Sequence, residues 1–365
     1  MIRAAFDVHV IGQRATGNET YAEGLMRAFQ TSPPSDIDLV FYHSQSDVAQ
    51  PNGHRFRRIW PDSPYLRVPL MTPFWLARDA VDVAHFQYFA PPVCPSAVVL
   101  TVHDLSFERY PEYFSPVFTR RMRSLMPWMS RNATRLIAVS AATRDDLVDL
   151  YGIDPAKIDV IHNGASSDFR VEPDRERSQA VLRIRAPFIV CVGNLGRRKN
   201  QARVVRAFAR LVHARGIEHD LVLIGKEEQS AREVHAEIEH GNVRGRVHLT
   251  GFVSREELVA LYNLASFCVY ASHYEGFGLP IVEAMACGTP VLTSSVSCMP
   301  EVADDAALLV DPSDDDALAA AMERLLDDRG LCERLRAAGL ERSRRFTWEE
   351  AAARTLDTYR KALVR

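Results

Sequence analysis

The sequence predicts an α/β protein made of two doubly wound domains, and three observations support this prediction. Short apolar runs of strand length alternate with segments of helical period through most of the chain, which is typical of βαβ units and parallel sheets. The 365 residues exceed what one hydrophobic core usually serves, so two domains are expected. A polar stretch over residues 165–182 follows His162-Asn163-Gly164 and marks the boundary between the domains.

In the first half, apolar runs bounded by turn residues predict six strands. They span residues 3–8, 39–42, 82–86, 98–102, 136–139 and 159–161. Helical periodicity predicts helices near 20–29, 116–130 and 142–151. We assign these elements to a first domain over residues 1–165.

The second half repeats the alternation. Its predicted strands span residues 188–192, 221–224, 247–249, 267–270, 291–293 and 307–310. Ser254 with Glu257, and Thr347 with Glu350, have the spacing of capping boxes at the start of helices. These elements predict a second domain over residues 166–345 and a C-terminal helix within 346–365.

Composition excludes several classes of protein. The formal net charge is -3 and no block of like charge occurs, so we expect no nucleic-acid partner. The six cysteines form no CxxC motif and no cluster with histidine at metal-ligand spacing, which predicts no metal and a reducing compartment. The N-terminus lacks the apolar region of a signal peptide and no run approaches 18 apolar residues. We therefore expect a soluble, cytoplasmic protein.

The segment that carries most chemistry is YASHYEGFGLPIVEAMACGTPVL, residues 270–292. A strand ends, a glycine-broken loop follows, and Pro280 opens a helix at a favoured first-turn position. With Gly276 and Gly278 clearing the approach, the helix N-terminus offers backbone N–H groups to an anion such as a diphosphate. Glu283, in the first turn, can then reach a ribose diol, and Glu275 can accept hydrogen bonds from sugar hydroxyls. The alternative is a plain turn followed by a carboxylate that complements the helix dipole.

A second segment, VGNLGRRKN, places two cations after a predicted strand. Arg198 and Lys199 suit a pair of phosphates, the first as a planar fork and the second as a point charge. The alternative is a solvated basic turn. Lysine is rare in this chain, since only Lys157, Lys199, Lys226 and Lys361 occur, and this rarity favours the phosphate interpretation.

Two further segments lie at predicted strand ends in the first domain. His103 and Asp104 end a buried strand, where the carboxyl edge of a parallel sheet concentrates function, although a lone histidine there can be purely structural. Gly12 and Gly17 lie in the first turn before the helix at Thr20. That turn lacks GxGxxG and is weak evidence for a nucleotide by itself.

Together these motifs resemble the retaining glycosyltransferases of family 4, whose members have the GT-B fold. The run E-G-F-G-L-P-x-x-E-A-M-A-x-G-x-P-V is specific to that family, and V-I-H-N-G before a linker is its usual interdomain marker. The order of HDL, HNG, RKN, EGFGLPxxE, PEV and LLVDP extends the resemblance over almost the whole chain. The RKN motif is similar to that of a mannosyltransferase-like branch.

The resemblance implies a role for each matching residue and a C-terminal helix that crosses back to the first domain. Glu275 and His103 would lie beside the donor sugar, and Arg198 and Lys199 would hold the diphosphate. The diphosphate would also meet the amides of Gly276, Phe277, Gly278 and Leu279, and the turn at Gly17 would close over it. Glu283 would bind the ribose, while Phe252 and Val253 would border the base.

The chain departs from the family pattern at three places. Asn194 stands where many relatives have an arginine after the strand-end glycine, so Arg198 must supply that charge. Ala271 replaces a common proline, which we expect to be harmless. The first turn has TGNETY in place of TGIGRY, which leaves the acceptor-side contacts of Asn18 and Glu19 open.

The resemblance implies transfer of a hexose, with mannose from GDP-mannose as the best match, to a sugar or lipid-linked sugar in polysaccharide assembly. Retention without a metal ion or other cofactor is expected. Two alternatives stay open, a nucleotide-sugar epimerase of the same fold and a sugar-nucleotide-binding subunit without turnover. The segment 113–135, rich in aromatic, methionine and arginine residues, either rests on the inner membrane surface or packs as a core helix with a basic outer face.

Overall fold

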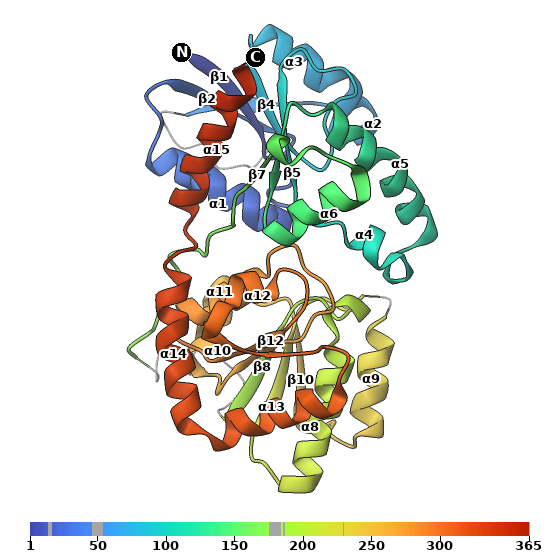
Figure 1. Ribbon diagram of the computed structural model, residues 1–365, viewed down its shortest axis with the longest axis vertical. Helices are drawn as coiled ribbons and strands as arrows, with labels where there is room; N and C mark the ends of the chain where they lie inside the picture. The colour runs from blue at the N-terminus through green and yellow to red at the C-terminus, as the bar shows by residue number, and fades with distance from the viewer. Residues whose placement is uncertain (14–16, 46–53, 175–183, 185–186, 229, 365) are drawn as a thin grey trace. The chain divides into compact units, whose positions relative to one another are not determined.

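The structure is a computed structural model that describes residues 1–13, 17–45, 54–174, 184, 187–228 and 230–364. The chain divides into two compact units (Figure 1). Unit 1 contains Met1–Gly164 and Thr347–Arg365, and unit 2 contains Ala165–Phe346. Each unit is built around a parallel sheet with helices on its faces, so the predicted fold class is confirmed.

The described sheet of unit 1 has the order β3-β2-β1-β4-β5-β6-β7, and every neighbouring pair is parallel. Its strands are β1 (Ile2–Asp7), β2 (Ile37–His43), β3 (Arg55–Arg58), β4 (Val83–Gln87), β5 (Ala97–Val102), β6 (Arg135–Ala138) and β7 (Ile158–Val160). Strand β3 was not predicted, because its sequence RFRR has no apolar run. An edge strand needs none, since one side of it faces solvent.

The helices of unit 1 include a segment that the sequence did not predict. The described helices are α1 (Gly17–Thr31), α2 (Pro64–Leu66), the π-helix η1 (Arg67–Met71), α3 (Thr72–Arg78), α4 (Ser106–Arg109), η2 (Pro111–Tyr113), α5 (Pro116–Asn132), α6 (Ala141–Tyr151), η3 (Pro155–Lys157) and α15 (Trp348–Leu363). Residues 64–78 are helical although they contain Pro64, Pro69 and Pro73. Two of these prolines lie at the start of a helix, where the missing N–H is not needed.

Helix α15 packs against the sheet and α1 of unit 1, although it follows unit 2 in the chain. Thr347 caps it by accepting a hydrogen bond from the Glu350 N–H at 3.2 Å. A Cβ on Gly24 of α1 would lie 2.1 Å from Cε2 of Trp348. The close approach of the two helices therefore requires glycine at position 24.

A buried hydrogen-bonded chain joins α15 to the sheet and to α1. The Tyr359 hydroxyl lies 2.8 Å from Nδ1 of His85, whose Nε2 lies 2.7 Å from the Thr101 hydroxyl. Thr101 is in turn 2.9 Å from the Tyr21 hydroxyl. All four side chains are almost fully buried, so each bond satisfies a polar group that water cannot reach.

The described sheet of unit 2 has the order β10-β9-β8-β11-β12-β13, again with parallel pairs. Its strands are β8 (Phe188–Val192), β9 (Asp220–Ile224), β10 (Val247–Gly251), β11 (Cys268–Tyr270), β12 (Val291–Ser294) and β13 (Ala307–Val310). The described helices are η4 (Arg197–Lys199), α8 (Gln201–Arg215), α9 (Ala231–His240), α10 (Arg255–Leu264), α11 (Leu279–Ala286), α12 (Met299–Ala303), η5 (Asp304–Ala306), α13 (Asp315–Asp327) and α14 (Arg329–Ser343). The capping box of Ser254 and Glu257 starts α10, as predicted.

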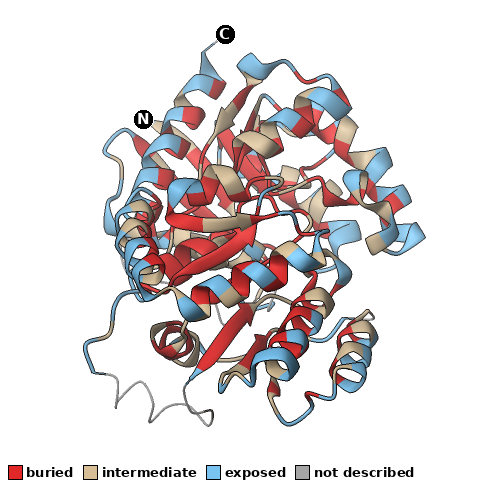
Figure 2. Cartoon of the chain, turned by 60° about the horizontal axis from the view of Figure 1, so that its bottom comes forward, coloured by how far each residue is buried: buried red, intermediate tan, exposed pale blue. Residues whose placement is uncertain are grey.

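The strands of both units are mostly buried, and the helices expose their outer faces (Figure 2). The chain order reverses between β1 and β4 in unit 1, and between β8 and β11 in unit 2. Such switch points open a crevice outside the carboxyl ends of the strands, where ligands of doubly wound sheets bind. No described helix is both long and apolar enough to traverse a bilayer.

We expect acid to destabilise unit 1 through His85. Burial lowers the pKa of His85 to about 3, below the value of about 6.5 for a histidine in an unfolded chain. The stability that depends on the neutral ring is therefore complete above about pH 6.5 and is lost as the pH falls towards 3, by up to about 1.4 kcal/mol per pH unit.

Urea unfolding at several pH values measures this effect. His85→Gln should reduce the loss of unfolding free energy between about pH 6 and pH 4, because one titrating group is removed. His213→Gln, on the exposed end of α8, is the control and should leave the slope unchanged. Equal slopes for His85→Gln and the unaltered protein would contradict the prediction.

Candidate active site

The switch point of unit 2 brings together two of the predicted segments. Strand β8 ends at Val192 and β11 ends at Tyr270, and the loops after them contain RRK and EGFG. The turns here are tightly packed, because a Cβ on Gly225 would lie 2.2 Å from the carbonyl oxygen of Gly193. Both glycines have positive φ angles, of 143° and 141°, which other residues adopt at a cost.

The central feature of the site is a buried carboxylate held by two cations. Oε2 of Glu275 accepts a hydrogen bond from Arg198 Nη1 at 2.6 Å, and Oε1 lies 2.7 Å from Lys199 Nζ. Arg198 Nη1 also donates to the Tyr274 carbonyl oxygen, and Lys199 Nζ donates to the Tyr270 hydroxyl at 2.8 Å. The sequence predicted all three charged residues at the site, but not their direct contact.

Charge compensation decides the ionisation of Glu275. Burial alone would raise its pKa, but Arg198 and Lys199 outweigh the burial and lower the pKa to about 2. The carboxylate is therefore ionised at neutral pH. Two cations and one anion leave the cluster with one net positive charge, which favours an anionic ligand.

Asn200 links the loop that carries the cations to two other strand ends. It has a left-handed backbone with φ of 57° at the N-cap of α8. Its Nδ2 donates to the carbonyl oxygens of Ala271 at 3.0 Å and Pro312 at 2.8 Å, and Arg203 Nη1 donates to the Pro312 oxygen at 3.1 Å. Asn200 therefore holds the cation loop against the ends of β11 and β13.

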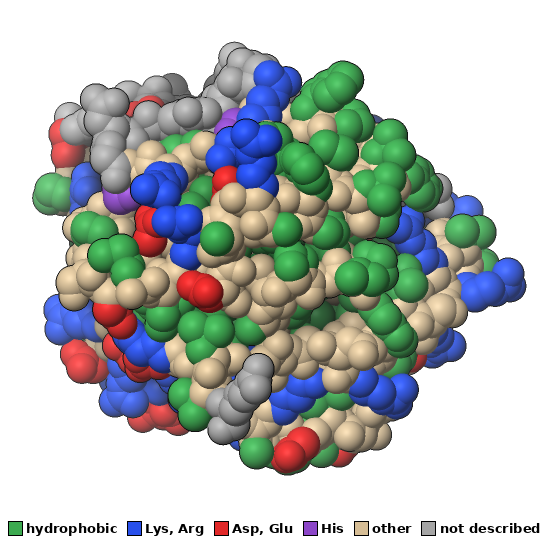
Figure 3. Space-filling model, turned by 90° about the horizontal axis from the view of Figure 1, so that it is seen from above, with side chains coloured by type: hydrophobic (Ala, Val, Ile, Leu, Met, Phe, Trp, Pro, Cys, Tyr) green, Lys and Arg blue, Asp and Glu red, His purple; other side chains and the backbone are tan. Residues whose placement is uncertain are grey.

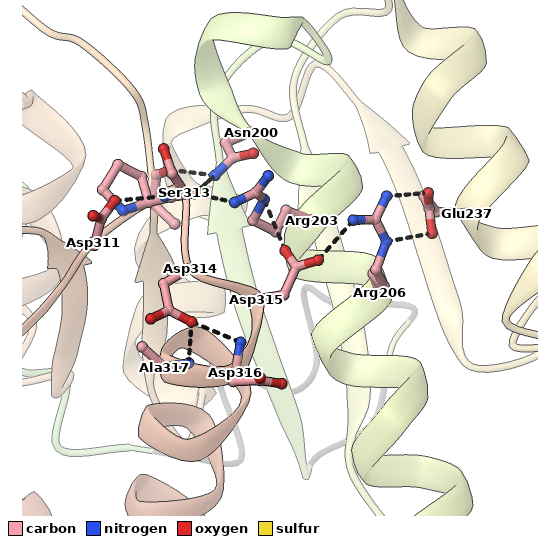
Figure 4. Close-up of polar contacts among 12 residues, drawn as sticks. Asn200, Arg203, Arg206, Glu237, Asp311, Ser313, Asp314, Asp315, Asp316 and Ala317 are labelled. Carbon is pink, nitrogen blue, oxygen red and sulfur yellow. Dashed lines mark hydrogen bonds and ion pairs between the residues drawn. The ribbon is translucent and has the colours of Figure 1, made fainter.

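Arginines of α8 extend this network onto neighbouring helices. Arg203 and Arg206 both pair with Asp315 of α13 at 2.9 Å, and Arg206 also pairs with Glu237 of α9 (Figure 4). Such exposed pairs contribute little individually, but they share one carboxylate and restrict its geometry. Sequence analysis missed the positioning role of Asn200, although its place directly after Lys199 was a signal.

The helix after the EGFG loop begins one residue earlier than predicted. Helix α11 starts at Leu279, with Gly278 as its N-cap at φ of 87° and Pro280 in its first turn. The expectation that Glu283 lies in the first turn is therefore wrong. A Cβ on Gly278 would lie 3.1 Å from the side chain of Ile281, and its positive φ further favours glycine.

Glu283 is buried one turn further into α11. The Tyr262 hydroxyl donates to its Oε2 at 3.3 Å. Burial raises the pKa of Glu283 to about 7, because no cation lies as close to it as those at Glu275. A ligand hydroxyl that donates to this carboxylate would favour its ionised form.

Lys226, to which the sequence analysis gave no role, lies beside Phe252. Lys226, which follows β9, places its Nζ 5.8 Å from the Phe252 ring centroid, and its N–H donates to Asn194 Oδ1 at 3.3 Å. Phe252 is 63% exposed, and Val253 is half-buried. An exposed aromatic face with a cation over it suits a planar, polar ligand group. The rarity of lysine was the signal that could have pointed to Lys226.

The predicted residues of the first domain lie in unit 1. His103 Nε2–H donates to Gln87 Oε1 at 2.8 Å, its ring contacts Tyr21, and burial lowers its pKa to about 4. Asp104 accepts hydrogen bonds from the N–H and hydroxyl of Ser106, which starts α4. Gly17 is the exposed first residue of α1. Neutral His103 can donate or accept one hydrogen bond, but it is not a cation.

Among the described residues, no group of three or more His, Cys, Asp and Glu side chains could hold a metal ion. The arrangement in unit 2 can instead bind an anion through side-chain cations and the N-terminus of α11.

Comparison with known proteins identifies what the chain is similar to. Residues 1–169 match the family model described as "Glycosyltransferase Family 4", and residues 174–342 match "Glycosyl transferases group 1". The O-antigen chain mannosyltransferase B of Escherichia coli is 31% identical over 290 residues, covering 78% of this chain and 76% of the relative. The MMP alpha-(1->4)-mannosyltransferase of Mycolicibacterium hassiacum is 33% identical over 242 residues, covering 65% of this chain and 56% of the relative.

Solved structures show the same two-domain fold. Sucrose-phosphate synthase from Thermosynechococcus elongatus has a TM-score of 0.80 at 23% identity over 99% of both chains. Anabaena HepE, solved in complex with UDP and glucose, has a TM-score of 0.77 at 18% identity over 99% of this chain and 100% of its own.

Proposed function

This chain belongs to glycosyltransferase family 4, and we propose that it transfers a hexose with retention from a nucleotide-sugar to a sugar or lipid-linked sugar. The observation that carries the proposal is the cluster of Arg198, Lys199 and Glu275 at the switch point of unit 2. A nucleoside diphosphate leaves readily once its charge is neutralised, and preorganised cations supply that neutralisation.

In the proposed complex, the diphosphate lies between the cation pair and the N-terminus of α11, from Gly276 to Leu279. Glu275 accepts hydrogen bonds from hydroxyls of the donor sugar, and its pairing with two cations makes it a weak nucleophile. Glu283 accepts hydrogen bonds from the ribose, which relieves the cost of its buried charge. The base stacks near Phe252 and Val253, with Lys226 at the rim.

We propose mannose, from GDP-mannose, as the transferred sugar, for a role in polysaccharide biosynthesis in the cytoplasm. The relatives that are named mannosyltransferases support mannose as the transferred sugar. HepE was solved with UDP, so guanine as the base of the donor has no support from the solved structures named here. An epimerase of this fold would turn over without an acceptor, and an inactive subunit would not release nucleoside diphosphate at all. Product release with and without an acceptor therefore separates the three functions.

We expect Arg198→Ala and Lys199→Ala each to lower kcat by about tenfold or more, toward the 10²–10³-fold typical of a lost preorganised donor. We also propose that these cations replace a metal ion, so turnover of the unaltered enzyme should survive EDTA. Steady-state rates with EDTA present throughout measure both effects.

Arg197→Ala is the matched control, because Arg197 belongs to the same turn but pairs with Glu233 on the exposed surface. Its kcat and its melting temperature should stay near those of the unaltered enzyme. Arg198→Ala and Lys199→Ala should stay folded, which circular dichroism checks, but each should melt at a lower temperature because buried Glu275 loses one of its two cations. Near-normal kcat in both Arg198→Ala and Lys199→Ala, or activity that EDTA abolishes and magnesium restores, would contradict the proposed charge compensation.

We expect the anomeric configuration of the donor to be retained. Glu275 is held by two cations, and His103 is neutral and donates to Gln87, so neither is suited to attack the sugar or to activate an acceptor as a strong base. The departing diphosphate then accepts the proton of the acceptor on the same face. An α-linked donor such as GDP-mannose should give an α-glycoside, and the anomeric carbon–proton coupling of the first-formed product measures this by NMR. A β-linked product would refute the mechanism.

We further propose that unit 1 contacts an anionic membrane surface through residues 60–74. Trp60 and Tyr65 are 70% and 76% exposed, and Leu66, Leu70 and Phe74 recur every four residues as an exposed apolar stripe. In Figure 3, hydrophobic side chains gather over the upper right part of the view, and Lys and Arg side chains lie next to them. Such a patch exceeds the scattered apolar residues of an ordinary surface.

Charge favours a lipid surface over another apolar protein face. Arg78, one turn after Phe74 in α3, and Arg58, near Trp60 in the chain, are exposed, and neither forms an ion pair among the described residues. Aromatic residues with flanking arginines suit the headgroup region of anionic lipids. In α5, where sequence analysis left membrane contact and core packing open, Met122, Met126 and Met129 are buried in the core, which favours packing for that helix.

Cosedimentation with vesicles tests the membrane surface. The unaltered protein should bind vesicles that contain phosphatidylglycerol and should bind phosphatidylcholine vesicles weakly. The triple variant Leu66→Ser, Leu70→Ser, Phe74→Ser should lose binding, because its apolar stripe is gone. The control Val93→Ser with Leu150→Ser changes exposed apolar residues elsewhere in unit 1 and should bind normally. Absent binding of the unaltered protein, or equal binding of the triple variant, would contradict this surface.

A further inference from the structure

The switch point of unit 1 carries a carboxylate–histidine pair that the donor chemistry does not use. Asp7 is the last residue of β1. Its Oδ1 accepts the backbone N–H of His9 at 3.1 Å, and its Oδ2 accepts the ring Nδ1–H of His9 at 3.0 Å. Two contacts between one carboxylate and one histidine restrict both the loop after β1 and the orientation of the ring.

A buried arginine also pairs with the Asp7 carboxylate. Arg67 begins the π-helix η1, and its Nη1 lies 3.6 Å from Asp7 Oδ2. Its side chain is almost fully buried, and its Nε has no hydrogen-bond partner among the described residues. Burial alone would raise the pKa of Asp7, but His9 and then Arg67 lower it below its usual value. Asp7 is therefore an ionised acceptor with a fixed orientation.

The contact with Asp7 determines the tautomer of His9. An ionised carboxylate can only accept hydrogen bonds, so in the neutral form of the ring the proton lies on Nδ1. Nε2 then carries a lone pair, and the described residues offer it no partner. One quarter of the His9 side chain is exposed, so a ligand can reach the ring. A fixed lone pair of this kind accepts a hydrogen bond from an O–H group.

The place of the pair in the fold indicates a ligand site. The sheet of unit 1 reverses its order between β1 and β4, as the sheet of unit 2 does between β8 and β11. In unit 2 that position holds Arg198, Lys199 and Glu275. In unit 1 it holds Asp7 and His9, and the adjacent strands β4 and β5 lead to Gln87 and His103. The carboxyl ends at a switch point are where ligands of this sheet type bind.

The charges of the two switch points differ, and so must their ligands. The unit 2 cluster has a net positive charge, whereas in unit 1 Arg67 pairs with the carboxylates of Asp7 and Asp62, and the part-exposed group is the His9 imidazole. An anion would be repelled by the Asp7 carboxylate and would find no donor on Nε2. A neutral, hydroxyl-rich ligand fits this chemistry.

We propose that His9, oriented by Asp7, accepts a hydrogen bond from a hydroxyl of the acceptor sugar, with Asp7 and Arg67 as positioning residues. The inference rests on the proposed function, because it assigns one contact of that function's acceptor. It predicts that loss of the His9 ring weakens the use of the acceptor and leaves the donor untouched.

The experiment compares transfer with donor hydrolysis. The donor is GDP-mannose, and the acceptor probes are the methyl α-glycosides of mannose, glucose and galactose. His9→Ala should lower kcat/KM for the acceptor by about tenfold, the effect of one lost hydrogen bond. The rate of nucleoside diphosphate release without acceptor should not change. His9→Gln, whose amide oxygen can accept the same hydrogen bond, should recover part of the loss.

His248→Ala is the matched control. His248 also contacts a carboxylate, with Nε2 2.7 Å from Asp220 Oδ2, but Asp220 begins β9 and so lies at the amino edge of its sheet. Its removal should leave both rates unchanged. Equal transfer by His9→Ala and the unaltered enzyme, or an equal fall in donor hydrolysis and transfer, would overturn the proposal.

A binding measurement keeps the proposal separate from the proposed function. With histidine labelled by ¹⁵N, the spectrum of His9 should show a protonated Nδ1 and an unprotonated Nε2, and the Nε2 signal should shift when a methyl glycoside is added. A protonated Nε2 in the free protein, or no response to any of the three glycosides, would overturn the assignment even if GDP-mannose is turned over. Absence of donor turnover with a normal His9 response would instead refute only the proposed function.

Discussion

The ionised, buried carboxylate of Glu275 is the constraint around which unit 2 is organised. A buried charge is tolerated only when it is compensated, and here Arg198 and Lys199 compensate it directly. Both cations belong to the short turn η4, whose position depends on Asn200 and its bonds to the ends of β11 and β13. The carboxylate thus holds two part-buried cations at one place, where the proposed diphosphate can replace part of that pairing with its own.

The two units share one sheet topology, but the side chains at their switch points differ in charge. Each sheet reverses its strand order once, and each reversal opens a crevice at the carboxyl ends of the strands. In unit 2 the residues after these strands are cationic and suit a charged leaving group. In unit 1 the corresponding residues, His9 and His103, present imidazole rings whose orientations are set by hydrogen bonds to Asp7 and Gln87. The charged donor and the hydroxylated acceptor that we propose therefore match separate halves of one repeated architecture.

Burial is the largest cause acting on the pKa of several groups in this protein, and only close charged partners reverse its effect. Glu275 and Glu283 are both almost fully buried, yet the pKa of the first falls to about 2 and that of the second rises to about 7. The difference follows from two adjacent cations at Glu275, against the Tyr262 hydroxyl at Glu283. The same principle keeps His85 neutral, where two hydroxyl partners supply hydrogen bonds but no compensating charge.

By itself, the sequence determined the fold class and named the residues that we propose for the donor site. Strand periodicity located β8 and β13 to the residue, and the RKN and EGFG motifs named Arg198, Lys199 and Glu275, because these signals are local. It missed β3 and the helical segment over residues 64–78, where arginines and prolines hide the usual patterns. Only the tertiary structure decided which charges touch, that Asn200 ties three loops together and that Asp7 orients His9. Those contacts join residues from separate strands and loops, and no local pattern in the chain encodes a distance between them.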